Sequence, residues 1–334
     1  MAQKPKKRVE HTLPAVHALH LVALCEKLGV REGVLLADVG LDRARLADPA
    51  AHVSLPTMGK LLRRARERTG EPGLGILLGL QMRISSHGWL GFAAMSAPTV
   101  RDALEIAARF TPTQTSALAM RLHEGPRTAA LVIEPRTPLG DAEDALILSL
   151  LVGIWQIGAA LTGRPLVGSA DVTFAEPPYF ARFRHLADIR FGQPVNQLVF
   201  KRDVLALPLV MADPAGGQLA LAECERALAQ LGGTAGADTA TRTRRIVARG
   251  GGGFRTLEEA ARELGVSTRT LKRRLAAERT TYRALVDEAR REHAILLLRD
   301  RGRSLEDVAT QLGYSDAANF SRAYRRWTGK PPRG

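Results

Sequence analysis

Apolar positions recur with a helical period over most of this chain, and they alternate with polar positions only in short stretches. In the first periodic segment, residues 13–29, Val16, Leu19, Leu24 and Leu28 fall among polar residues, which predicts a helix that ends at Gly29. A second kind of signal is Thr99, which can cap a helix whose first turn contains an acid. Comparable patterns predict helices over residues 56–69, 72–82, 99–110, 141–163 and 216–231.

The period changes to two after residue 115. SALAMRLHEG over residues 116–125 and RTAALVIEP over residues 127–135 each read as one strand, joined by a turn at Gly125-Pro126. A helix from Pro178 to Leu186 should follow later. Since helices and strands mix without a regular βαβ rhythm, an α+β domain is expected over residues 13–231. Further extended segments are predicted over residues 169–175, 188–191 and 197–201.

The last eighty residues contain one small unit twice. TLEEAARELGVS over residues 256–267 and SLEDVATQLGYS over residues 304–315 align without a gap. Each copy opens with Ser or Thr followed three residues later by an acid, a capping box that starts a helix. Each first helix ends near Gly265 or Gly313, where a residue without Cβ can take a positive φ. Each copy therefore predicts a helix-turn-helix.

The second helix of the first copy has one apolar and one cationic face. Leu271 and Leu275 share a face, whereas Arg269, Lys272 and Arg273 lie opposite them. A helix fits the major groove of DNA, where Arg or Lys can pair with guanine and small side chains can contact a thymine methyl. An ordinary solvated basic face is the alternative interpretation for one such helix.

The second copy repeats this division. Phe320, Tyr324 and Trp327 share its apolar face. Two helices of the same design in one basic segment favour DNA reading over two ordinary surface helices. The opposite face of this helix carries Ala318, Ser321, Arg322 and Arg325.

The amino-acid composition indicates where this basic domain begins. GGTAGADTA, residues 232–240, is predicted to be a flexible linker, and residues 242–249 a short first helix of the domain 241–334. A periodic helix over residues 282–299 joins the two copies, and 18 residues span about 27 Å. Such a helix could hold the two reading helices about 34 Å apart, one turn of DNA.

Charge is concentrated in the same segment. The chain has a formal net charge of +14, and residues 242–334 hold 22 Lys and Arg against 11 Asp and Glu. Residues 1–12 are predicted to be a disordered basic tail, and the residues between are close to neutral. This distribution suits a polyanion and gives affinity without sequence choice. A membrane surface fits less well, because the basic helices have a core face of their own.

The cysteine content and the hydropathy of the chain indicate its cellular location. Cys25 and Cys224 lack a CxxC partner and are interpreted as buried thiols in a reducing cytoplasm. The longest apolar run, around residues 145–154, falls short of the roughly twenty residues of a membrane span. The start of the chain lacks the apolar core of a signal peptide. The expected location is the cytoplasm, without membrane contact.

No constellation of catalytic or metal-ligating residues is recognisable. GxSxG, P-loop and strand-associated GxGxxG motifs are absent from the sequence, so an enzyme and a cofactor are not expected. His17 and His20 are three residues apart on one helix, but without a third ligand of suitable spacing no metal site is predicted.

The doubled unit, with LGVSTRTLKRRL and LGYSDAANFSRAYRRWTGKPP, resembles the DNA-binding domain of AraC/XylS transcription regulators over residues 240–334. The middle of the chain, in GWLGFAAMSAPTVRDALEIAARF and FGQPVNQLVFKRDVLALPL, resembles the arabinose-binding-domain type of N-terminal module in the ornithine-utilisation-regulator branch. The module's name does not establish a sugar ligand. The family usually continues with Tyr-Arg, whereas this chain stops at Gly334.

The resemblance implies a bacterial regulator that binds promoter DNA and contacts RNA polymerase, favouring an activator. It also implies a homodimer on direct-repeat half-sites and an N-terminal module that senses an unknown small molecule or dimerises. Ala317 and Ala318 offer no side-chain hydrogen bonds, which favours methyl contact or DNA shape in the second copy. By position, the base-reading residues are Arg269, Lys272, Arg273, Ala318, Asn319, Ser321 and Arg322, and the phosphate-binding residues are Arg274, Arg325 and Arg326.

An effector pocket is harder to predict from sequence. The aromatic residues proposed for it can equally form ordinary core, and the polar ones can lie at the surface. Two further readings of the chain stay open: a non-specific architectural DNA binder, and an enzyme tethered by the basic domain, as in alkyl-transfer repair proteins. The predicted pocket residues are Arg83, His87, Trp89, Phe92, Met95, Trp155 and Phe174.

Overall fold

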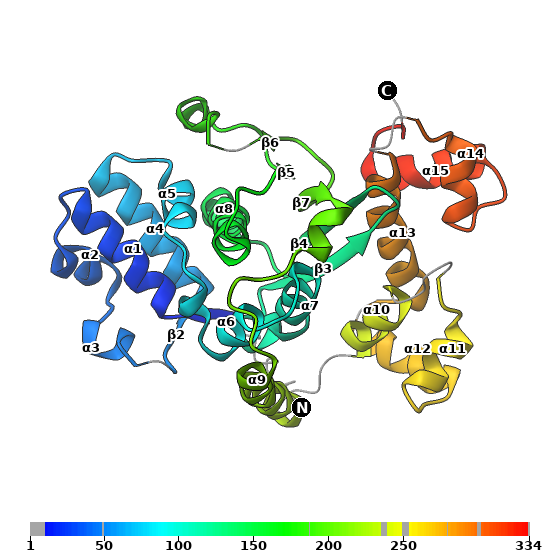
Figure 1. Ribbon diagram of the computed structural model, residues 1–334, viewed down its shortest axis with the longest axis horizontal. Coiled ribbons are helices and arrows are strands. Elements are labelled where there is room, and N and C mark those ends of the chain that lie inside the picture. The colour runs from blue at the N-terminus through cyan, green and yellow to red at the C-terminus, as the bar shows by residue number, and fades with distance from the viewer. Residues whose placement is uncertain are drawn as a thin grey trace, which may run out of the picture. The chain divides into compact units, whose positions relative to one another are not determined.

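A computed structural model of the chain divides into two compact units (Figure 1). The first comprises residues 1–122 and 131–226, and the second comprises residues 123–130 and 227–334. The structure describes residues 11–48, 50–186, 188–234, 239–248, 254–278, 280–298 and 302–332. Most of the predicted basic tail therefore lies outside the described residues, but its last residue, Thr12, already belongs to a strand.

The first unit begins with a short strand pair and a group of helices. Leu13 of β1 pairs with Val53 of β2 in an antiparallel register, so the first helix starts at Val16 rather than at Leu13. Ser54 caps α4 by accepting a hydrogen bond from the Thr57 amide at 3.3 Å. The elements are β1 (Thr12–Pro14), α1 (Val16–Lys27), α2 (Glu32–Val39), α3 (Arg43–Leu46), β2 (His52–Ser54), α4 (Leu55–Thr69) and α5 (Leu74–Leu80).

An apolar helix, α8 (Glu143–Thr162), packs closely against α5. A Cβ at Gly75 would meet the Ala145 backbone at 2.5 Å, and one at Gly79 would meet Val152 at 2.7 Å. Only glycine therefore allows this separation of the two helices. With η3 (Gly140–Ala142), α8 forms a 23-residue helix that contains an 18-residue window of mean hydropathy 2.0, long and apolar enough to cross a membrane by length and composition. The expectation that no run approaches that length was wrong, although a core helix of a folded unit passes the same test.

Two more helices and four more 3-10 helices belong to the described part of the first unit. Thr99 and Asp102 form the predicted capping box of α7, with the Asp102 amide donating to Thr99 Oγ1 at 3.3 Å. The stretch predicted as a helix to Leu186 is instead a 3-10 helix that follows Pro177 and ends at Phe183. The elements are η1 (Ile84–His87), α6 (Gly88–Met95), α7 (Val100–Phe110), η2 (Thr111–Thr113), η4 (Pro178–Phe183) and η5 (Arg202–Ala206).

A five-stranded sheet completes the α+β architecture, in the order β3-β4-β7-β5-β6. The predicted hairpin is confirmed: the Gly125 amide donates to the Thr128 carbonyl at 2.8 Å. β5 is antiparallel to β7 and parallel to β6, and it is shorter than the predicted strand over residues 169–175. The strands are β3 (Leu118–Glu124), β4 (Thr128–Pro135), β5 (Gly168–Asp171), β6 (Ile189–Arg190) and β7 (Asn196–Lys201).

The basic domain is helical in the predicted order. Both capping boxes form, and Gly265 and Gly313 have φ values of 66° and 76°. Helices extend into the predicted linker 232–240 from both sides, and residues 235–238 lie outside the described residues. Helix α9 (Pro214–Thr234) leads up to this domain, whose helices are α10 (Thr239–Ala248), α11 (Leu257–Glu263), α12 (Thr268–Ala277), α13 (Tyr282–Leu298), α14 (Leu305–Gln311) and α15 (Ala317–Thr328).

The connecting helix α13 anchors both copies of the repeated unit. Leu285 of α13 shares a core with Leu271 and Leu275 of the first copy. Towards the second copy, the Arg290 guanidinium lies 5.1 Å from the centre of the Tyr314 ring. The two reading helices are therefore held by one continuous helix, as the sequence predicted.

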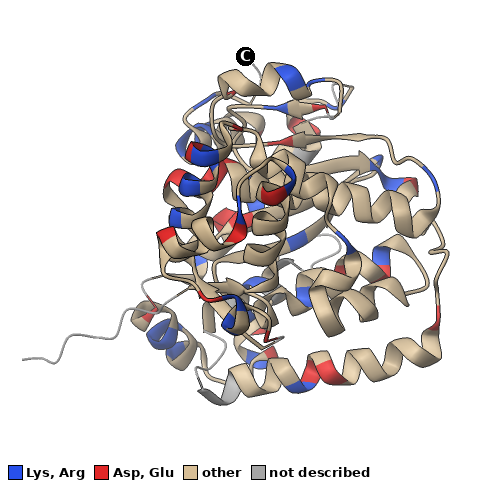
Figure 2. Cartoon of the chain, turned by 90° about the vertical axis from the view of Figure 1, so that its left-hand side faces the viewer, with Lys and Arg blue, Asp and Glu red and all other residues tan. Residues whose placement is uncertain are grey.

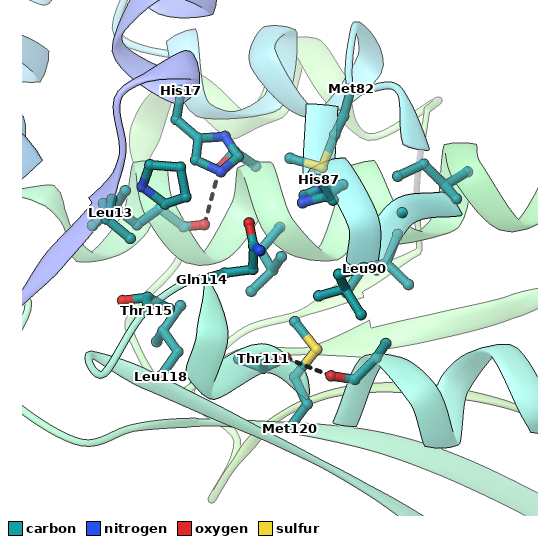
Figure 3. A pocket seen from close by; sticks show the side chains of 18 of the residues that line it. Leu13, His17, Met82, His87, Leu90, Thr111, Gln114, Thr115, Leu118 and Met120 are labelled. Atoms are coloured by element: carbon teal, nitrogen blue, oxygen red, sulfur yellow. Dashed lines mark hydrogen bonds between the residues drawn. The ribbon is translucent and has the colours of Figure 1, made fainter. Parts of the chain in front are cut away.

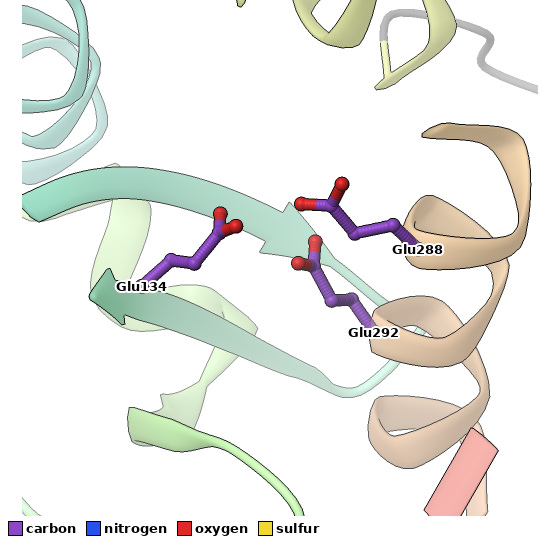
Figure 4. Close-up of side chains that lie close together, drawn as sticks. All are labelled: Glu134, Glu288 and Glu292. Atoms are coloured by element: carbon purple, nitrogen blue, oxygen red, sulfur yellow. The ribbon is translucent and has the colours of Figure 1, made fainter. Parts of the chain in front are cut away.

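Acidic side chains of α13 add polar contacts to this core. Glu288 accepts a hydrogen bond from Arg244 of α10 at 3.0 Å, which ties the first helix of the domain to α13. Figure 4 shows Glu288 and Glu292 one helical turn apart on α13, and Glu134 projecting from β4. Glu134 is paired with Arg136 at 3.1 Å and with Arg121.

Candidate nucleic-acid interface and buried cavity

The first reading helix, α12, presents its cations to solvent because its apolar residues are fixed. Ser267 caps the helix by accepting from the Thr270 amide at 3.2 Å, and Leu271 and Leu275 are fully buried. The residues on the outer face are all exposed, and within the described part of the chain none of their side chains forms an ion pair or a hydrogen bond. These residues are Arg269, Lys272, Arg273 and Arg274.

The second reading helix, α15, is anchored by aromatic rings. Phe320 is fully buried, and its ring centre lies 5.8 Å from that of Tyr324 and 6.0 Å from that of Tyr314. Trp327 packs 6.2 Å from Tyr314. On the outer face Ala318, Arg322 and Arg325 are exposed, whereas Asn319 and Ser321 are half-buried. The sequence-predicted division of this helix into a core face and an outer face therefore exists in the structure.

Asn319 is the most connected side chain on the outer face of α15. Its Nδ2 group donates to Asp316 Oδ2 at 2.6 Å and to Ser315 Oγ at 2.7 Å. Its Oδ1 accepts a hydrogen bond from Arg322 Nη2 at 2.6 Å. Asp316 in turn caps the helix by accepting a hydrogen bond from the backbone amide of Asn319. This hydrogen bond is the main reason why the pKa of the Asp316 carboxyl is lowered. The capped turn thus holds the Arg322 guanidinium on the outer face.

The basic residues predicted to contact phosphates fall into two groups. Arg274 and Arg325 are exposed and unpaired among the described residues, so both are available to a polyanion. Arg326 lies 3.4 Å from Asp287 of α13, which partly neutralises it. On the face seen in Figure 2, basic and acidic residues are interspersed along the helices rather than gathered in one block. Arg242, Arg262 and Arg283 are exposed as well, so the available cations of the second unit include the two reading helices but are not confined to them.

The first unit contains a partly open cavity of about 220 Å³. Helices α1, α4, α5, α6, α7 and α8 and strand β3 supply its lining, which is mostly Leu, Ile, Met and Ala. Figure 3 shows Gln114 between His17 and His87, with Met120 and Leu118 below them. The lining thus combines a large apolar surface with a small polar region.

The polar region contains histidines that stay neutral at neutral pH. The ring centres of His17 and His87 are 5.7 Å apart, and those of His17 and His20 are 6.5 Å apart. Burial, followed by the neighbouring His87 and His20, lowers the pKa of His17 to about 3. Burial and His20 lower the pKa of His87 to about 4. The structure therefore adds a third histidine to the pair seen in the sequence, but within the described residues the three do not gather their ring nitrogens around one ion position.

Three hydroxyl groups of the lining are already satisfied by the backbone. Thr111 donates to the Ala107 carbonyl at 2.7 Å, Thr115 to the Thr12 carbonyl at 2.7 Å, and Ser149 to the Leu146 carbonyl at 3.0 Å. In contrast, the side chains of Gln114 and His17 form no hydrogen bond with any described residue. The groups left for a ligand are therefore the Gln114 amide and the imidazoles.

Of the seven predicted pocket residues, only His87 lines this cavity. Trp89 and Phe92 are 53% and 38% exposed. Phe174 packs 5.9 Å from Phe191, and Trp155 contacts the strand at Gly168. Arg83 is exposed and Met95 is half-buried, both outside the lining.

Sequence reasoning missed Gln114, and it considered His17 only as a metal ligand. These residues come together from α1, η1 and the segment after α7, which are distant in sequence. No local pattern marks such a meeting, and the histidine pair of α1 was the one visible signal.

Comparisons with known proteins give a consistent result. Residues 29–209 match the family model described as the arabinose-binding domain of AraC transcription regulator, N-terminal, and residues 260–334 match a helix-turn-helix domain model. The ornithine utilization regulator of Pseudomonas aeruginosa is 32% identical and aligns over 99% of this chain and 98% of its own length. An uncharacterised regulator of the helix-turn-helix type from Mycobacterium tuberculosis is 30% identical over 98% of this chain and 96% of its own. The crystal structure of the regulator CdpR of P. aeruginosa matches with a TM-score of 0.46 at 22% identity, covering 95% of this chain and 96% of the other.

Proposed function

The chain belongs to the AraC family of transcription regulators, and on this premise we propose that it is an effector-controlled activator that reads promoter DNA through α12 and α15. DNA-binding transcription regulation is the function of the family, whose members are regulators and not enzymes. The observation that carries the proposal is the pair of exposed cationic helix faces, each backed by a fixed core face. The proposed domains are residues 13–231 for sensing or dimerisation and residues 241–334 for DNA.

In this proposal the two helices divide the contacts by reach and charge. Arg269, Lys272 and Arg273 read base edges from α12, while Ala318, Ser321 and Arg322 do so from α15. Asn319 contributes by holding Arg322, since its side-chain amide already donates to Ser315 and Asp316 of the capped turn. Arg274, Arg325 and Arg326 contact phosphates, which positions the protein without selecting sequence.

The test of DNA reading is selection of binding sites from randomised duplexes by the full chain. A sequence-specific regulator should prefer its selected site over random duplex by roughly a thousandfold or more. Arg63→Ala, which removes one positive charge from α4 in the first unit, is a control and should leave this preference unchanged. Nearly equal affinity for all duplexes would favour an architectural DNA binder instead and would overturn the proposal.

We further propose that a small molecule in the cavity of the first unit tunes this activity, and that the protein acts as a homodimer with RNA polymerase at bacterial promoters. Support comes from the match of residues 29–209 to an arabinose-binding domain model and from a partly open cavity with unpartnered polar groups among the described residues. Transcription from the selected site, with purified polymerase and increasing protein, tests activation. A fall in transcript at saturating protein would show a repressor.

A further inference from the structure

The cavity offers hydrogen bonds but no charge to a ligand. None of the described residues that line it is Asp, Glu, Lys or Arg. The titratable side chains that face it are His17, His20 and His87, and burial lowers the pKa of all three. A charged ligand would therefore lose its hydration without gaining a counter-ion, which strongly opposes binding.

The same lining is a poor match for a sugar. A pentose carries four hydroxyl groups, each of which must find partners once it leaves water. The hydroxyl hydrogens of Thr111, Thr115 and Ser149 are committed to backbone carbonyls. Gln114 and the histidines cluster on one side, and apart from these three hydroxyl groups the remaining lining is apolar. A molecule with one polar end suits this arrangement better than one that is polar all round.

The volume of the cavity limits the size of the occupant. A dry apolar cavity of about 150 Å³ accommodates benzene, which has six non-hydrogen atoms. At the same packing, the 220 Å³ cavity has room for about nine such atoms. Ornithine and arabinose are of this size, so chemistry rather than volume distinguishes them from other candidates.

We propose that the effector of this regulator is an uncharged, mainly apolar molecule of about nine non-hydrogen atoms, whose single polar end bonds to Gln114 and the neighbouring histidines. This inference rests on the proposed effector control and specifies its ligand class. The apolar part lies against the side chains on the far side of the cavity, among them Leu118 and Met120. The proposed effector therefore differs from the sugar that the name of the domain family suggests.

The test uses five probes of similar size on the full chain, namely 1-octanol, octanoate, octylamine, arabinose and ornithine, with calorimetry and thermal unfolding as readouts. At pH 7 only 1-octanol should bind with measurable heat and raise the melting temperature. Between pH 7 and 9, above the ordinary histidine pKa of 6.5 that burial lowers for His17, His20 and His87, octanol affinity should be constant. Octanoate affinity should rise towards low pH and octylamine affinity towards high pH, because each follows the neutral fraction of the probe.

Two variants, Met120→Trp and Gln114→Leu, locate the binding site, and Val167→Trp serves as the control. Met120→Trp places an indole in the cavity and should abolish octanol binding, whereas Val167→Trp adds the same group at an exposed position of the first unit and should not. Gln114→Leu, of similar size, should weaken octanol binding roughly three- to tenfold by removing one hydrogen bond. This second variant keeps the site testable if Met120→Trp does not fold.

The outcomes separate the ligand class from the function. If octanoate, octylamine or ornithine binds at pH 7 as well as octanol and Met120→Trp abolishes that binding, the uncharged character of the ligand is wrong and effector control stands. The same result with arabinose would mean that its mainly apolar character is wrong. If octanol does not bind the wild-type chain, the inference is overturned as well. DNA reading is judged separately by the site selection, which needs no effector probe.

Discussion

Replacing Asn319 by alanine tests whether this residue reads a base or positions one that does. The substitution removes the acceptor of the Arg322 guanidinium and both donations to the capped turn, while the backbone hydrogen bond to Asp316 remains. A hydrogen bond to a charged group contributes about 1.5–3 kcal/mol when it is well shielded, and less at an exposed position such as Arg322. Freed from Asn319, the arginine must lose part of about 2 kcal/mol of rotamer entropy on binding DNA.

These contributions predict a loss of about 1 kcal/mol, or about fivefold in affinity. The loss should fall on the base pair that Arg322 reads. The assay is titration of the selected duplex and of its single base-pair variants with the full chain, for Asn319→Ala, Arg322→Ala and the double variant. If Asn319 acts through Arg322, then Asn319→Ala should have no further effect once Arg322 is gone. The matched control is Thr270→Ala on α12, whose hydroxyl bonds to Ser267 and to no arginine.

Two results would refute the positioning role. Additive losses in the double variant would mean that the two side chains act independently. A change in preference at a base pair that Arg322→Ala leaves untouched would mean that Asn319 contacts a base directly. Either result would return Asn319 to the base-reading set.

Further predictions concern both units. Arg273→Ala should cost about 1–3 kcal/mol of discrimination at one or two base pairs, whereas Arg325→Ala should weaken all duplexes alike and lower the salt slope by about one; the reverse pattern would exchange their roles. The folded-state pKa values of His17 and His87 lie below their ordinary 6.5, so the stability they contribute is present above pH 6.5 and is lost as pH falls towards about 4. Urea unfolding should show a slope of up to about 1.4 kcal/mol per pH unit for each histidine, reduced in His17→Phe, and an unchanged slope would contradict their burial as neutral rings. Gly265→Ala should cost about 1–2 kcal/mol in the same assay, because its φ is 66° and no other atom crowds the position, so a neutral effect would argue against the left-handed turn.

The DNA-binding part could be predicted because its signals are local. Capping boxes at Thr256 and Ser304 and positive-φ glycines at Gly265 and Gly313 each act within a few residues. Helical periodicity then assigns each side chain to a face, so Leu271 is buried where the pattern required it. Local rules of this kind also placed the hairpin of β3 and β4 and the capped start of α7.

The cavity could not be predicted because it depends on contacts between distant segments. His17 and His87 meet only when α1 and η1 pack together, and Gln114 joins them from the segment after α7. Aromatic content was a misleading guide, since Trp89 and Phe92 face solvent. A large apolar side chain marks burial poorly when the chain leaves an apolar face exposed.

The two reading helices are built alike but are equipped differently, and this constrains how the site is recognised. Arg273 and Arg322 occupy the same position relative to their helix caps, yet α12 adds Arg269 on the face where α15 has Ala318. Long donors on α12 favour hydrogen bonds to guanine, while a methyl group on α15 favours contact with thymine or with DNA shape. Because α13 anchors both copies through one core and one stacked arginine, we expect the contacts of α12 to fix the register in which α15 meets the DNA. Helix α15, which has fewer long hydrogen-bond donors, would then add selectivity at a site that α12 has already located.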